Sequence, residues 1–191
     1  INLVASVILT ANNQVMAEQQ MLNQLRCHQQ LINDLGAAAH LTNPTTQPSR
    51  IVEIAEDLGW LDRESHAYGD LLALKSINAV MLTWYRNNIL HLLALPSLIA
   101  CLLVNRRRGV KTGQLQQSIA LIFPYIAQEL SAWVPGTTDS VLDSMARLDL
   151  IRREDDVILP ATQQSEHRMQ LVLLSKLSLI HISEPTRLST I

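Results

Sequence analysis

The stretch Gly59–Leu74, GWLDRESHAYGDLLAL, decides the class of fold that we expect. It reads as a hydrophobic pair, a polar turn and a short apolar strand, which is the pattern of a small β-hairpin. The stretch Leu148–Ala161, LDLIRREDDVILPA, repeats this pattern. Each stretch follows a short amphipathic helix, expected at about residues 48–58 and 138–148, where apolar residues recur at helical spacing.

A helix followed by a small hairpin resembles the second half of a winged-helix unit, and two copies suggest a repeated supersecondary unit. Winged helices often bind DNA, and others serve only as protein-interaction modules. The net charge of −2 argues against a nucleic-acid partner, because nucleic-acid binders usually carry a basic excess. The concentrated basic patch, which comprises Arg106, Arg107, Arg108 and Lys111, lies outside both units. We therefore expect no nucleic-acid binding.

Composition favours helices and an apolar partner. Hydrophobic residues make up 48% of the chain and aromatic residues only 4%, so Leu, Ile, Val and Ala must fill the core. Charged residues are 17%, which is low and indicates that some apolar surface meets a partner, another domain or a lipid. We predict a mainly α fold with small β-hairpins, an α+β arrangement of two winged-helix-like helix–hairpin units around a central hydrophobic helix.

Cysteine and histidine spacing indicates no metal site. Cys27 and Cys101 are expected to be free thiols, as in most cytosolic proteins. No C-x-x-C or H-E-x-x-H spacing is present. His28 lies on the apolar stripe of a helix expected at about residues 14–35, so we interpret it as a core histidine and not as a ligand.

The central hydrophobic helix is expected within Ala79–Gly109, AVMLTWYRNNILHLLALPSLIACLLVNRRRG. Its apolar part, Ile89–Val104, is shorter than the roughly 20 residues that span a bilayer, and Pro96 should kink it. We therefore predict a buried or interfacial helix. The arginines at its end have two interpretations: a solvated or dipole-capping helix end, or a contact with anionic lipid headgroups.

Both ends of the sequence are unusual. The chain opens on Ile1 and an apolar run without a basic region, which favours a chain that begins within a longer protein over a signal peptide. From about residue 178, the segment SLIHISEPTR is similar to a peptide that arises when sequencing adapter is translated. We expect this tail to be artefactual and assign no function to His181.

One segment carries a family resemblance. YRNNILHLLALPSLIA (Tyr85–Ala100) resembles a Y-R-N-N-hydrophobic-x-H-hydrophobic block in the C-terminal region of bacterial membrane-associated glycerol-3-phosphate 1-O-acyltransferases. Segments Gly69–Asn88 and Leu150–Leu174, and the opening INLVASVILT, are similar to neighbouring parts of that region. The resemblance covers roughly residues 1–176.

The resemblance implies an activity and a place in the cell. Enzymes of this family transfer an acyl group from acyl carrier protein or coenzyme A to sn-glycerol 3-phosphate, the first step of phospholipid synthesis. The implied partners are an upstream acyltransferase domain and the membrane surface, on the cytoplasmic side of the bacterial inner membrane. The resemblance implies no cofactor beyond the acyl donor.

The family's chemistry uses an H-x-x-x-x-D motif in which the Asp orients a His that acts as general base. No His of this chain has an Asp at that spacing: His28 precedes Asp34 by six positions and His66 precedes Asp70 by four. We therefore predict no catalytic residue here and no activity for the chain alone. The alternative is a non-enzymatic helical module that binds a protein partner.

The remaining candidate site is a polar cluster, Arg86, Asn87, Asn88 and His91, at the start of the apolar helix. Helical spacing puts residues 87 and 91, and 88 and 91, on shared faces. The cluster either meets the partner domain or a substrate phosphate, or it satisfies buried backbone groups.

These inferences divide the chain into five segments. They are helices after the acyltransferase domain (1–36), a helix–hairpin unit that opens with a linker (37–84), the hydrophobic helix and a kinked helix (85–135), a second helix–hairpin unit with a following helix (136–177), and the tail (178–191).

Overall fold

The computed structural model describes residues 1–36, 46–75, 79–131 and 137–183, without the side chains of Ala79 and of residues 179–183. The chain forms two compact units, Ile1–Leu90 and His91–Ile191. The division falls inside one helix, α4 (Ala79–Val104). We describe each unit by itself.

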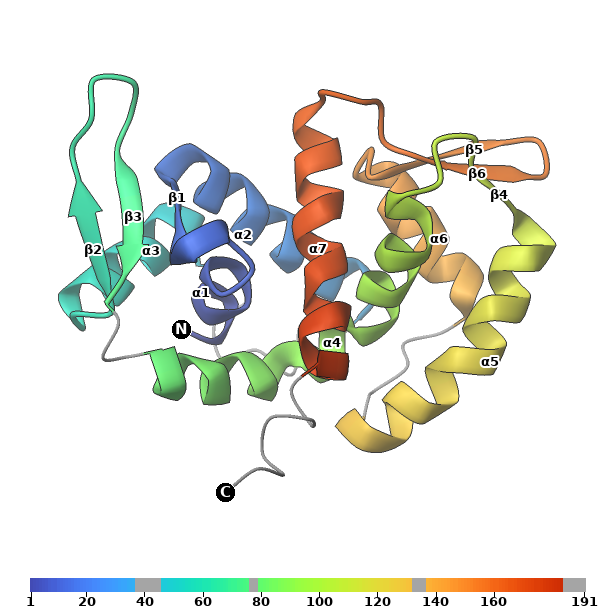
Figure 1. The fold of residues 1–191 in the computed structure, drawn as a ribbon, viewed down its shortest axis with the longest axis horizontal. Helices are drawn as coiled ribbons and strands as arrows, with labels where there is room; N and C mark the ends of the chain where they lie inside the picture. Colours follow the sequence, from blue (N-terminus) through green and yellow to red (C-terminus); the bar gives the residue numbers. More distant parts are fainter. Residues whose placement is uncertain (37–45, 76–78, 132–136, 184–191) are drawn as a thin grey trace. The chain divides into compact units, whose positions relative to one another are not determined.

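The first unit joins a small sheet to three helices that precede the start of α4 (Figure 1). Its three strands are antiparallel, in the order β1-β3-β2. In chain order, its elements are α1 (Asn2–Ile8), a 3-10 turn η1 (Asn12–Gln14), β1 (Val15–Ala17), α2 (Glu18–Asp34), α3 (Pro48–Asp57), β2 (Leu61–Glu64) and β3 (Leu71–Leu74).

The second unit repeats this order after the end of α4 and adds a final helix. Its antiparallel sheet has the equivalent strand order, β4-β6-β5. Its elements are β4 (Val110–Lys111), α5 (Thr112–Leu130), α6 (Thr138–Arg147), β5 (Ile151–Glu154), β6 (Val157–Pro160) and α7 (Glu166–Ser183). The predicted fold class and the repeated helix–hairpin unit are confirmed, and each repeat is a helix, a strand, two helices and a hairpin, as in a winged helix.

The repeats agree in their backbone hydrogen bonds. Helix α3 ends in a Schellman motif in which Trp60 N–H donates to Ala55 O and Gly59 N–H to Glu56 O. Helix α6 ends in the same way, through Leu150 N–H to Met145 O and Asp149 N–H to Ala146 O. The first residues of α2 and α5 also make equivalent hydrogen bonds to the hairpin that follows in the same unit. Glu18 N–H donates to Asp70 O in the first unit, and Thr112 N–H donates to Asp156 O in the second.

Each hairpin is joined to its helices by an equivalent arginine. Arg63 of β2 lies within 2.9 Å of carboxylate oxygens of Glu18, Glu56 and Asp70, which belong to α2, α3 and the end of the hairpin turn. Arg153 of β5 contacts Asp139 and Asp143 of α6. These clusters link one hairpin strand to the helix that precedes it.

Helix α4 is longer than the apolar part expected from its sequence. The most apolar 18-residue window of its segment Val80–Val104 has a mean hydropathy of 1.8, and this is, among the described residues, the one helix long and apolar enough to cross a membrane. However, 67% of its most apolar window is buried within the protein, as in the core helix of a soluble protein. Pro96 lies inside the helix, and Ser97 Oγ donates to Ala94 O next to it.

Two helix boundaries differ from the expected ones. Helix α2 begins at Glu18 and not near residue 14, because Val15–Ala17 pair with β3 as a strand. Helix α7 continues to Ser183, past the point at about residue 177 where the helical pattern was expected to stop, and Ser178 is buried within it. Most of the predicted linker and the last eight residues lie outside the described residues.

Candidate functional site

The predicted polar cluster lies on α4, and its members differ in exposure. Arg86 is buried, with 2% of its surface exposed, and donates from Nε and Nη2 to Asn87 Oδ1 at 3.3 and 3.1 Å. Asn87 and Asn88 are exposed and His91 is half-buried. The ring of Tyr85 lies against Trp60, with centroids 4.9 Å apart. The arginine of the cluster is thus buried, whereas its two asparagines are exposed.

The start of α4 also exposes large apolar side chains. Val80, Met81 and Trp84 are 76%, 51% and 74% exposed. Residues 80, 84, 87 and 88 recur at the spacing of one helical face, so the exposed asparagines continue this apolar face toward the C-terminus. We call Val80, Trp84, Asn87 and Asn88 the α4 face.

His28 is enclosed in the first unit by a chain of hydrogen bonds. Gln24 Nε2 lies 2.9 Å from His28 Nε2, His28 Nδ1 lies 3.2 Å from Ser6 Oγ, and Ser6 Oγ donates to Leu3 O at 2.8 Å. An amide donor on Nε2 and a hydroxyl on Nδ1 suit a neutral ring that carries its proton on Nδ1. Burial lowers the pKa of His28 to about 3. The Ser6–His28 pair is therefore a core contact, in agreement with the expectation from the sequence.

The two cysteines are free thiols. Burial raises the pKa of Cys27 to about 12 and also raises that of Cys101. Both therefore stay protonated near neutral pH and are poor nucleophiles. The parts of the chain that the structure describes contain no group of three His, Cys, Asp or Glu side chains that would hold a metal ion.

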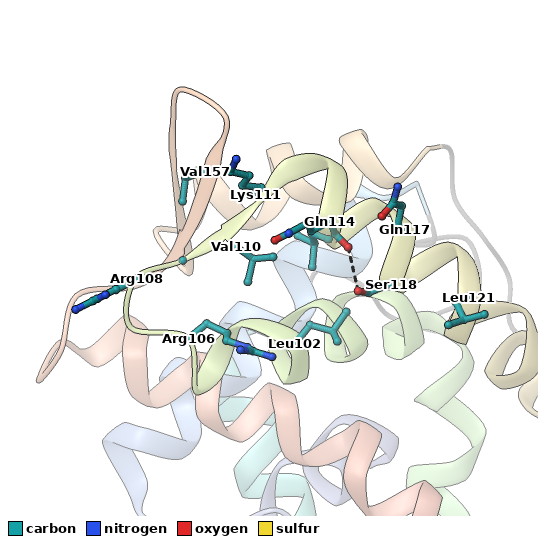
Figure 2. Close-up of a pocket in the computed structure, with 12 residues that line it drawn as sticks. Leu102, Arg106, Arg108, Val110, Lys111, Gln114, Gln117, Ser118, Leu121 and Val157 are labelled. Carbon is teal, nitrogen blue, oxygen red and sulfur yellow. Dashed lines mark hydrogen bonds between the residues drawn. The ribbon is translucent and has the colours of Figure 1, made fainter.

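A pocket in the second unit lies where α4 leads into β4 and α5 (Figure 2). Its volume of about 670 Å³ is within the range of small-molecule sites. Among the described residues, its lining contains three cations, three neutral polar side chains and no carboxylate; these residues are Leu102, Arg106, Arg108, Gly109, Val110, Lys111, Gln114, Leu115, Gln117, Ser118, Leu121 and Val157. In Figure 2, Val110 and Gln114 are drawn between Arg106 and Lys111.

A carbonyl at the end of α4 is hydrogen-bonded by an arginine from outside this pocket. The carbonyl of Val104, at the end of that helix, accepts a hydrogen bond from Arg168 of α7. Burial and the nearby charge of Arg107 lower the pKa of Arg168. A residue of α7 thus satisfies this carbonyl, and the arginines of the basic patch add further positive charge near the end of α4.

The sequence located the cations of this pocket but not its walls. The first turns of α5 contribute Gln114, Gln117 and Ser118 to the pocket. Val157 comes from β6, the strand that pairs with β4. The pairing of Val110 and Lys111 with Ile158 and Val157 brings that strand to the pocket.

Comparison with known proteins identifies the family. A family model described as the glycerol-3-phosphate acyltransferase C-terminal region matches residues 1–184. Similar curated proteins are the glycerol-3-phosphate acyltransferases of Pseudomonas fluorescens strains SBW25 and Pf0-1, which are 33% and 32% identical over 181 residues. These alignments cover 92% of this chain but 22% of each relative, so the chain spans about a fifth of the length of the curated relatives that it matches. The resemblance found in the Tyr85–Ala100 block is confirmed: the chain belongs to the family of glycerol-3-phosphate acyltransferase C-terminal regions.

Proposed function

We propose that this chain acts as the C-terminal part of an enzyme that transfers an acyl group from acyl carrier protein or coenzyme A to sn-glycerol 3-phosphate. The observation that carries the proposal is the family match over residues 1–184, together with relatives that bear the name of this activity. The product of the parent enzyme would enter phospholipid synthesis.

The chemistry itself is proposed to lie in the part of the parent protein that this chain does not cover. None of the six histidines has an Asp five positions later, so the motif of a positioned general base is missing from this sequence. Burial lowers the pKa of His28 to about 3, so this histidine is unsuited to proton transfer at neutral pH. The role of the chain is then to pack against the catalytic domain.

The α4 face is our candidate for that contact. It combines exposed apolar side chains with two exposed amides, the mixture found at protein interfaces with an apolar centre and a polar rim. Trp84, at 74% exposure, is the type of side chain that often dominates the binding energy of such a contact. The assembled protein is proposed to lie on the cytoplasmic face of the bacterial inner membrane, where its acyl product would enter the bilayer.

A chimera tests the proposal. The matching fifth of the Pseudomonas fluorescens SBW25 enzyme is replaced by this chain, and acyl transfer to glycerol 3-phosphate is measured for the chimera, for the truncated enzyme and for the isolated chain. We expect activity only from the chimera and the intact enzyme. Turnover by the isolated chain would overturn the assignment of the chemistry to the missing part. A stably folded but inactive chimera would instead favour the non-enzymatic interaction module.

Variants of the chimera test the α4 face and the buried arginine. Trp84→Ser and Asn88→Ala should lower activity, whereas Tyr68→Ser, which changes an exposed ring in the β2–β3 turn, should not. Equal activity of all three variants would contradict a contact through the α4 face. Arg86→Ala should lower the thermal stability of the chimera because it removes the packing of a side chain that is buried in the protein.

A further inference from the structure

The two repeats differ in the loop that leads into their first strand. In the first unit this loop is Ala11-Asn12-Asn13-Gln14, which is uncharged. In the second unit the residues before β4 include Arg106, Arg107 and Arg108, and β4 itself ends in Lys111. Because the two units share strand order and capping bonds, the fold does not require this charge.

The cations of the basic patch also differ from the other described arginines and lysines in their interactions. No hydrogen bond or ion pair is found for the side chains of Arg106, Arg108 and Lys111 in the described part of the chain. Every other described arginine and lysine outside the patch makes at least one interaction, as Arg63 and Arg153 do with carboxylates. Three unpaired cations around one pocket without a carboxylate create a positive potential that suits an anion.

The polar wall of the pocket adds to this potential. Helix α5 begins at Thr112, whose N–H donates to Asp156 O, and it has no side-chain cap and no acidic residue in its first turn, so the positive end of its dipole adds to the charge of the cations. Gln114 and Gln117 supply neutral donors next to it. Burial and the nearby charge of Arg107 lower the pKa of Arg168, so these two cations lie close enough to repel each other.

We propose that Arg106, Arg108 and Lys111 bind the phosphate group of a phosphate ester in this pocket. Guanidinium groups pair with phosphate oxygens through two parallel hydrogen bonds, and the pocket offers two of them with a lysine. The ester is carried either by a phospholipid headgroup or by a soluble molecule.

The apolar wall favours the lipid source. Leu102, Leu115 and Val157 line the same pocket as the cations, and Leu121 at its edge is 71% exposed. Tyr125, one turn farther along α5, is 73% exposed. A ligand that has a phosphate group and an apolar body would contact both walls at once.

The test measures binding by the 191-residue chain to two probes. One probe is vesicles of phosphatidylcholine with or without phosphatidylglycerol, assayed by flotation, and the other is inorganic phosphate, assayed by its shift of the melting temperature. The variant Arg106→Gln/Arg108→Gln removes two pocket cations. The control Arg107→Gln/Arg152→Gln removes two exposed arginines that do not line the pocket, so the net charge of the two variants is equal. Circular dichroism checks that both are folded.

We expect the pocket variant to bind phosphatidylglycerol vesicles about 25-fold less tightly, since each guanidinium that pairs with a headgroup phosphate contributes about a fivefold factor. The control variant should lose much less of its affinity for these vesicles. Vesicle binding that depends on the pocket identifies the lipid source, and a pocket-dependent response to inorganic phosphate alone identifies a soluble ester. Equal losses in the two variants, or no binding of either probe, would overturn the proposal.

This inference does not rest on the proposed acyl transfer. Its readout is binding by the chain alone, whereas the chimera reports turnover, so either can fail while the other holds.

Discussion

His28 makes the stability of the chain depend on pH. Its pKa is about 3 in the folded chain and 6.5 as an ordinary side chain, so between these values the unfolded chain binds the extra proton. The stabilising effect of the neutral ring is complete above pH 6.5 and is lost as the pH falls toward 3. If the ring were charged, Nε2 would carry an N–H that faces the amide donor of Gln24, and the hydrogen bond between these two nitrogens would be lost.

We predict that the free energy of unfolding falls by up to about 1.4 kcal/mol per pH unit below 6.5 because of this group. In His28→Gln this slope should flatten, as measured by urea unfolding between pH 7 and pH 4. The control is His66→Gln, which changes an exposed histidine of the hairpin turn and should keep the wild-type slope. Identical slopes for all three proteins would contradict the prediction.

Asp149 occupies a position that suits glycine. It follows α6 with φ of 54°, whereas Gly59 has φ of 70° at the equivalent position after α3. A side chain in this left-handed conformation is strained, although Asp tolerates it better than most residues. We predict that Asp149→Gly raises stability by about 0.5–1 kcal/mol and that Gly59→Ala lowers it by about 1 kcal/mol. Thermal unfolding measures both changes, and Ala146→Gly, within α6, is the control that should destabilise.

At the scale of elements, Gly109 allows β4 to approach β6. A Cβ at this position would lie 2.6 Å from Val157 Cγ1 and 2.7 Å from Ile158 O, and its φ is 73°. We predict that Gly109→Ala costs about 2–4 kcal/mol through overpacking and backbone strain. Gly113→Ala is the matched control, because a Cβ there meets nothing within 4 Å and lies in the first turn of α5. Equal melting temperatures for the two variants would contradict the close approach of β4 to β6.

Local elements were predictable and distant pairings were not. The two hairpins and the helices before them follow from alternation and helical spacing within short windows. Strands β1 and β4 were missed because they have three and two residues and pair with Ala73 and Ile158, which lie far along the sequence. Since such short segments carry no periodicity, Val15–Ala17 merged with the pattern of the following helix.

The candidate sites divide in the same way. The Arg86–His91 cluster and the basic patch were visible as runs in the sequence. The burial of Arg86, the capping of α4 by Arg168 and the wall that Val157 gives to the pocket all depend on tertiary packing. The sequence therefore indicated which charged residues form the candidate sites, but not which of these residues are buried or paired.

At the scale of the whole molecule, the chain leaves much apolar surface uncovered. Val80, Trp84, Leu121 and Tyr125 are each more than 70% exposed. We predict that the isolated chain self-associates, because exposed apolar groups of this size gain free energy by leaving water. Size-exclusion chromatography with light scattering should show oligomers that decrease in Trp84→Ser/Leu121→Gln. A clean monomer for the unmodified chain would count against this prediction.

The charged outer strands have a further consequence at this scale. Strands β2 and β5 lie at open edges of their sheets, and β2 exposes Asp62, Arg63 and Glu64 while β5 exposes the equivalent Arg152, Arg153 and Glu154. An open edge is a template on which another copy can add a strand and begin an amyloid-like fibre, and charged side chains along the edge oppose that addition. The opposite edges, β1 and β4, are too short to serve as templates. A chain with 17% charged residues thus concentrates part of its charge where aggregation through its sheets would start.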